Sequence, residues 1–84
     1  MQTKALNDIS FLAGFLAGRQ MRRRDERDGC VLLSDHGITR IAAIMRADGS
    51  TTSECAGVMF GYENPDWTCP DIERVDAERN GSDL

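Results

Sequence analysis

The chain of 84 residues has a single histidine and no closely spaced pair of cysteines, which removes most metal chemistry. Structural zinc sites pair their ligands at spacings of about two to four residues, whereas the three cysteines lie 25 and 14 residues apart, at Cys30, Cys55 and Cys69. An odd number of widely spaced cysteines also argues against a disulfide framework. We therefore predict no metal site and no cofactor.

The sequence also lacks a constellation suited to nucleophilic catalysis. Ser34, Asp35 and His36 are consecutive, so they cannot place the base between nucleophile and acid as a catalytic triad does. Cys30 could meet His36, but no oxyanion site can be recognised near this pair. Neither a calcium-binding loop nor a glycine-rich phosphate loop is present. We predict that the protein is not an enzyme and has no catalytic residue.

No apolar run is long enough to cross a membrane. The run from Ile9 to Ala17 has about half of the ~20 residues that a span needs. The strongest positive charge follows this run, whereas in a secretory signal it comes first. Together with the odd number of cysteines, this pattern predicts a protein of the reducing cytoplasm.

Charge is abundant and unevenly distributed. The net charge is −4 at pH 7, and nine of the ten basic residues are arginine. Residues 1–28 carry six basic and four acidic side chains, whereas residues 51–84 carry two basic and eight acidic ones. This asymmetry predicts electrostatic steering toward a charged partner.

Residues 3–27 have the apolar periodicity of one long helix, and Asp28-Gly29 supplies its stop. Gly14 and Gly18 lie one turn apart on this helix. Each glycine costs about 1 kcal/mol of helix propensity relative to alanine, so another element is expected to approach closely there. That element is either a sheet of the same chain or the same helix of a second copy in a homodimer.

Residues 29–62 allow two interpretations. Asp48-Gly49 can form a hairpin turn, and β-branched residues on both sides of it favour strands. The alternative is a helix over residues 37–47, capped by Ser34 or Asp35 and ended by Gly49, in which one face is formed by Ile38, Ile41, Ala42 and Met45. We favour the hairpin, since Gly37 is a poor residue with which to open a helix.

The predicted fold class is therefore α+β, in a single small domain over residues 1–84. The long N-terminal helix packs on a three-stranded antiparallel β-meander over residues 29–62, and a short acidic C-terminal segment follows over residues 63–84. Within that segment, Thr68, Pro70 and Asp71 resemble a helix start. The helical alternative for residues 37–47 would give a loose helix-turn-helix, with Arg40 and Arg46 directed at DNA.

Two surfaces are candidates for binding. Aromatic residues beside carboxylates are typical interface anchors, and the predicted partner-binding residues are Tyr62, Glu63, Asp66, Trp67, Asp71, Glu73 and Asp76. The alternative is a basic patch at the end of the helix that would contact phosphates, formed by Arg19, Arg22, Arg23 and Arg27. Acidic residues interrupt this patch and the whole chain is acidic, so we favour the first surface.

In overall character the chain resembles phage-borne inhibitors of host defence of the anti-CRISPR type, being small, acidic, single-domain and without motifs. The resemblance involves no shared motif. It implies a non-enzymatic protein that inhibits or masks a partner by competing with nucleic acid through an acidic surface. We expect a protein partner, such as a nucleic-acid-binding complex, with no membrane and no direct nucleic-acid binding. A small DNA-binding regulator that uses the Arg19 to Arg27 helix end is the alternative function.

Overall fold

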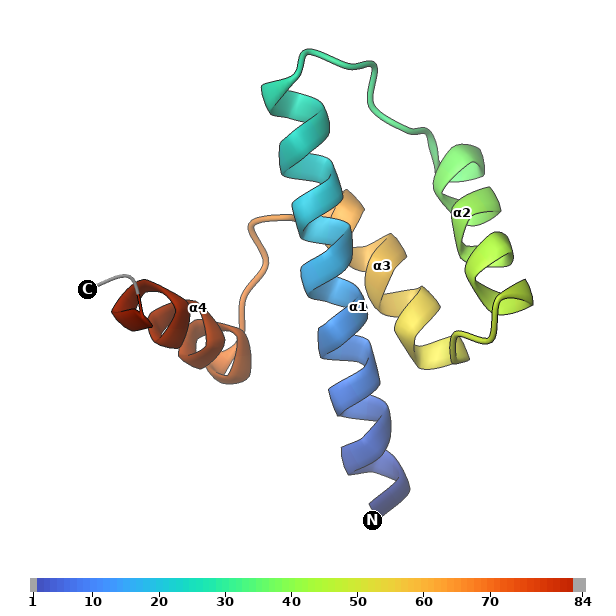
Figure 1. Ribbon diagram of the computed structural model, residues 1–84. Helices are drawn as coiled ribbons and strands as arrows, with labels where there is room; N and C mark the ends of the chain where they lie inside the picture. Colours follow the sequence, from blue (N-terminus) through green and yellow to red (C-terminus); the bar gives the residue numbers. More distant parts are fainter. Residues whose placement is uncertain (1, 83–84) are drawn as a thin grey trace.

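The molecule is built from helices. The computed structural model describes the backbone of residues 2–82 and the side chains of residues 9–78, and in that part of the chain it has four helices and no strand. These are α1 (Gln2–Arg27), α2 (Asp35–Ala47), α3 (Thr52–Glu63) and α4 (Pro70–Ser82). In Figure 1, α1 runs through the middle, with α3 and α2 on one side and α4 on the other. The predicted α+β fold with a β-meander over residues 29–62 is wrong.

The segment that we had interpreted as the first hairpin arm is the helix α2. The helical alternative for this segment named its cap and its stop correctly. The Ser34 side chain caps the helix by accepting a hydrogen bond from the Gly37 N–H at 3.2 Å. At the other end Gly49 has a φ of 105°, and the Ser50 N–H donates to the Met45 carbonyl at 2.9 Å. This is a Schellman end to the helix. The positive φ of Gly49 therefore ends a helix, where we had expected it to turn a hairpin.

The segment interpreted as the second hairpin arm is α3. Thr51 is its N-cap, and the Thr51 hydroxyl accepts a hydrogen bond from the Glu54 N–H at 3.0 Å. Threonine followed three residues later by glutamate is the sequence pattern of a capping box. That pattern, rather than an extended arm, accounts for the threonine-rich and serine-rich stretch after Gly49.

The contact between α1 and α3 is made by glycines from both helices. A β-carbon added to Gly14 or Gly18 would collide with a backbone carbonyl oxygen of α3, that of Glu54 or Val58. In the same way, a β-carbon added to Gly57 of α3 would collide with the carbonyl oxygen of Phe11, and one added to Gly61 would collide with that of Phe15. The close approach that Gly14 and Gly18 predicted is thus to a helix of the same chain, and the expected sheet is absent from the described residues.

The core lies on both sides of this glycine contact. Between α2 and α3, the buried side chains of Ile38, Val58 and Tyr62 form one cluster. The partly buried side chains that cover it are Met21, Ile41, Met45 and Met59. Phe15 and Ile72 are also buried. Ile72 belongs to α4, so the C-terminal helix has one apolar anchor in the protein interior.

The C-terminal segment, in which Thr68, Pro70 and Asp71 predicted a helix start, forms the 13-residue helix α4. Pro70 is the first residue of α4, a position where the missing N–H of proline costs nothing. The Glu73 N–H donates to the Cys69 carbonyl at 2.9 Å, which begins the helical hydrogen bonding. The helix then continues to Ser82, and residues 83–84 of the predicted segment lie outside the described backbone.

Candidate binding surface around Trp67

Trp67 lies in the linker between α3 and α4, with one part of its ring in the core and the rest exposed. The backbone N–H of Trp67 donates to the Asn64 carbonyl at 3.1 Å, which closes a turn after α3. The indole packs edge-on against two phenylalanines, with centroid distances of 5.4 Å to Phe15 and 5.1 Å to Phe60. Even so, 40% of the Trp67 surface stays exposed. The aromatic packing fixes the orientation of the ring and leaves part of its surface exposed.

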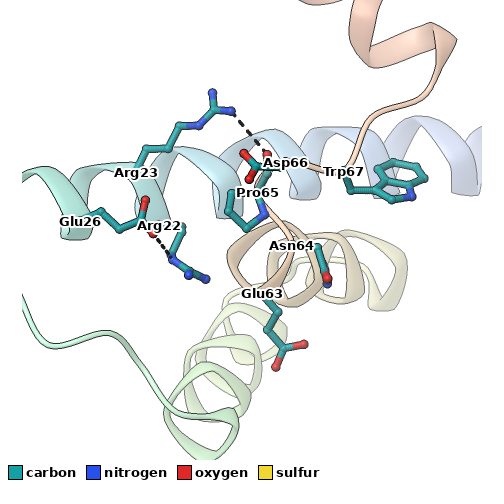
Figure 2. Close-up of a pocket in the computed structure, with 8 residues that line it drawn as sticks. All are labelled: Arg22, Arg23, Glu26, Glu63, Asn64, Pro65, Asp66 and Trp67. Carbon is teal, nitrogen blue, oxygen red and sulfur yellow. Dashed lines mark hydrogen bonds and ion pairs between the residues drawn. The ribbon is translucent and has the colours of Figure 1, made fainter.

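On one side of Trp67 lies an open groove of about 520 Å³, which we call the linker groove. It lies between the C-terminal half of α1 and the α3–α4 linker (Figure 2). Its lining residues are Arg22, Arg23, Glu26, Glu63, Asn64, Pro65, Asp66 and Trp67. Of the two arginines in this groove, Arg22 is engaged within the protein and Arg23 has one long contact. Arg22 pairs with Glu26 at 2.9 Å and donates to the Tyr62 carbonyl at 2.7 Å, while Arg23 reaches the Pro65 carbonyl at 3.5 Å.

Trp67 also lines a smaller and more apolar hollow of about 250 Å³, which we call the tryptophan hollow. Phe11 and Leu12 of α1 form one wall, and Trp67 forms another. Cys69 and Asp71 complete the lining, so a carboxylate stands beside an aromatic surface. Trp67 is the residue that the linker groove and the tryptophan hollow share.

The predicted acidic partner-binding residues have different surroundings. Glu63, Asp66 and Glu73 are exposed, and Asp71 is half-buried with a 3.1 Å ion pair to Arg74. Asp76 differs from these because both of its oxygens accept from the Arg19 guanidinium, at 2.8 and 3.1 Å. Asp76 therefore holds α4 against α1.

Glu63 lies beside another carboxylate, that of Asp35 at the start of α2. A hydrogen bond shared with Asp35 raises the pKa of Glu63 above its ordinary value, and burial and the Asp35 charge act in the same direction. Two carboxylates that share a site favour the state in which one of them holds a proton. Glu63 at the end of α3 therefore takes up a proton at a higher pH than an isolated glutamate does.

Tyr62 is a core residue with 1% of its surface exposed, so it does not form part of the surface around Trp67. Its hydroxyl donates to Asp25 Oδ2 at 2.7 Å and accepts from the Leu33 N–H at 3.0 Å. It thereby joins α3, α1 and the α1–α2 loop. Burial raises the pKa of Tyr62 above its ordinary value of 10.0, and the Asp25 hydrogen bond adds to the rise.

The predicted basic patch is divided between interior and surface. Arg19 is 8% exposed and is bound by Asp76, and Arg22 is engaged as described above. Arg23 and Arg27 are exposed on α1, and Arg27 has only a long contact of 3.5 Å to Asp28. The sequence alone does not distinguish the buried arginines from the exposed ones, because all four lie at the same cationic end of the helix.

The α2–α3 pair has the spacing of a helix-turn-helix but not its charge. The second helix, which would enter the major groove, carries Glu54 and Glu63 and no basic residue. Arg40 and Arg46 lie on α2, and Arg46 donates to the Ser50 carbonyl at 2.6 Å. Of the two arginines predicted to face DNA, Arg40 is exposed on α2, whereas Arg46 is engaged with the end of its own helix.

The cysteines and the histidine do not converge. Cys30 and His36 are exposed, whereas Cys55 is buried and its thiol lies 3.4 Å from the Ala42 carbonyl. Within the described residues, no group of three metal-ligating side chains comes together.

One exposed apolar feature has no counterpart in the sequence predictions. The α1–α2 loop exposes Val31 (93%), Leu32 (39%) and Leu33 (36%). We had predicted that these residues belong to the β-meander, where their apolar side chains would be buried. Gly29, whose φ is 72°, ends α1 before the apolar run starts, as predicted, but this stop does not distinguish a loop from a strand.

None of the described helices combines the length and apolar character needed to cross a membrane. Comparison with protein families, with characterised proteins and with solved structures found none that is detectably similar to this chain.

Proposed function

We propose that this protein is a non-catalytic binding module that masks a basic surface of a partner protein, with Trp67 as its central anchor. The observation that carries the proposal is the position of Trp67, 40% exposed and shared by the linker groove and the tryptophan hollow. Protein interfaces are centred on such aromatic anchors, and a polar rim surrounds them.

The charge around the anchor supports a basic partner. Residues 63–78 hold six carboxylates and one arginine. Asp66 lines the linker groove beside Trp67, and Asp71 lines the tryptophan hollow. A partner segment with an apolar side chain flanked by arginine or lysine matches both features. Complementary charge of this kind raises the association rate and makes it sensitive to salt.

Basic surfaces of this kind are common on proteins that bind nucleic acid. We therefore propose that the module competes with nucleic acid for the partner, as the resemblance to anti-CRISPR inhibitors implies. The three free cysteines are compatible with a reducing compartment such as the cytoplasm, where we expect the protein to act.

The test is a tagged pull-down from lysate, with and without nuclease, followed by identification of the captured protein. The wild type should retain one stoichiometric basic partner after nuclease treatment, and added nucleic acid should displace this partner. Trp67→Ala should weaken its binding by at least about 2 kcal/mol, as truncation of a hot-spot residue does. Ile44→Ala is the matched control, since Ile44 is 59% exposed on α2, outside the linker groove and the tryptophan hollow.

Two results would contradict the proposal. Equal binding by the wild type and the Trp67→Ala variant would remove Trp67 as the anchor. Recovery of nucleic acid alone, lost on nuclease treatment, would instead favour a DNA-binding regulator that uses the exposed arginines of α1.

A further inference from the structure

A third hollow, of about 240 Å³, runs along α1 and is lined by that helix alone. We call it the arginine groove, and its lining residues are Leu16, Arg19, Gln20, Arg23, Arg24 and Arg27. They recur at spacings of three and four residues, which places them on one stripe of the helix. Unlike the linker groove, the arginine groove has no carboxylate among its lining residues. Four arginines thus gather at one place on a protein whose net charge is −4.

Three of the four guanidiniums have donors to offer a ligand. Arg19 is taken by Asp76. Arg23 and Arg27 have single contacts of 3.5 Å, to the Pro65 carbonyl and to Asp28, which is too long for strong hydrogen bonds. Arg24 is exposed, and no hydrogen bond joins its side chain to another described residue. Their mutual repulsion is partly relieved by the negative end of the helix dipole.

We infer that the arginine groove binds a compact polyphosphate group, of which a diphosphate is the smallest. The planar guanidinium offers five donors in a fork that matches phosphate oxygens. Three full positive charges outweigh the roughly half negative charge of the helix C-terminus. A volume of about 240 Å³ is below the range of about 300–1,000 Å³ typical of sites that enclose a drug-sized molecule. The groove therefore holds the phosphates and leaves any attached nucleoside in solvent.

The inference does not depend on the proposed protein-binding function. It is tested by isothermal titration of the whole protein with inorganic pyrophosphate at low salt. Arg23→Gln and Arg24→Gln should each weaken pyrophosphate binding about tenfold, since each removes a hydrogen bond between charged groups. Both residues are exposed, so neither change should disturb the fold. Arg40→Gln, which removes an exposed arginine of α2 outside the groove, should leave the affinity unchanged.

Further titrations identify the ligand. ADP should bind within about threefold of pyrophosphate, because the attached nucleoside stays in solvent. A single phosphate should bind at least about tenfold more weakly, because the affinity depends on the number of adjacent phosphates. An equal loss on Arg40→Gln and Arg24→Gln would overturn the inference in favour of diffuse charge attraction. Binding of a single-stranded oligonucleotide without measurable binding of pyrophosphate would also overturn it, in favour of an extended nucleic-acid backbone.

Discussion

Four glycines determine how closely α1 and α3 approach each other. Gly14 and Gly18 on α1 face Gly57 and Gly61 on α3, and each lies against a carbonyl oxygen of the opposite helix. Small residues four apart allow helix backbones to approach in this way, a device best known from membranes. Here both halves of the motif belong to one chain. The cost of glycine in helix propensity is offset by the burial of Phe15 and Val58, which the close contact makes possible.

We expect Gly18→Ala to destabilise the protein by about 2 kcal/mol or more. Overpacking costs about 1–3 kcal/mol, and here the colliding atoms belong to a backbone that cannot rotate away. The gain in helix propensity is at most about 1 kcal/mol. Urea denaturation measures the change in the free energy of unfolding.

Gly37→Ala is the control for this substitution. Gly37 is also helical, but the atom nearest to an added β-carbon is Leu33 Cδ2 at 3.3 Å, the end of a flexible side chain. We expect this variant to be as stable as the wild type or slightly more so. If both substitutions had the same effect, close packing at Gly18 would not be the reason for its glycine.

The ionisation of Tyr62 provides a second test at the scale of single residues. Its pKa is raised by burial, so the folded protein keeps the phenolic proton at pH values where the unfolded chain has lost it. This contribution to stability is complete below pH 10.0, the ordinary value, and is lost as the pH rises through the folded pKa. Tyr62 is the only tyrosine, so tyrosinate absorbance reports it alone.

We expect a midpoint above 10.0 for the folded protein and a lower one in denaturant. The stability of Tyr62→Phe should lack this alkaline loss, and at neutral pH the variant should be about 1–2 kcal/mol less stable, because the hydrogen bonds to Asp25 and Leu33 are gone. The same midpoint with and without denaturant would show that the hydroxyl is not held in the interior.

At the scale of elements, α4 is the helix with the fewest attachments. Among the described residues it is fixed mainly by the buried side chain of Ile72 and by the ion pair between Asp76 and Arg19. The Arg19 side chain is 10% exposed and that of Asp76 is 41% exposed, so the pair is half-shielded from water. Removing one partner of such a pair costs more than removing one partner of a surface ion pair.

We expect Asp76→Asn to release α4 from α1, at a cost of about 1–2 kcal/mol, because Arg19 then remains buried without its charged partner. Amide hydrogen exchange should become faster in α4 and stay unchanged in α3. Glu73→Gln is the control, since Glu73 is exposed on the same helix. Equal exchange rates in α4 for both variants would mean that Ile72 alone holds the helix.

The sequence predicts some of these elements better than others. The apolar periodicity and the stop at Gly29 indicate α1 within one residue at its start. The residues of α2 fit a strand and a helix equally well, since Asp48-Gly49 can open a hairpin or follow a Schellman end. The decisive evidence lay outside the segment, in the capping box of α3 and in Gly57 and Gly61, which repeat the spacing of Gly14 and Gly18.

At the scale of the whole molecule, the sequence indicates which charges are present but not which of them reach the surface. Trp67, Asp66 and Asp71 line hollows, whereas Tyr62 is buried and Asp76 is bound by Arg19. Such pairings join residues far apart in the chain, and no local pattern encodes them. The linker groove and the arginine groove are adjacent, because Arg23 lines both of them.

The most direct test of the protein-binding account is a titration of the labelled protein with the purified partner, followed by NMR. We predict that the Trp67 indole N–H and the backbone amides of Asp66 and Asp71 shift most, and that these shifts weaken as salt is added. Shifts confined to the exposed loop at Val31 to Leu33, with Trp67 unaffected, would contradict the account and move the binding surface to the α1–α2 loop.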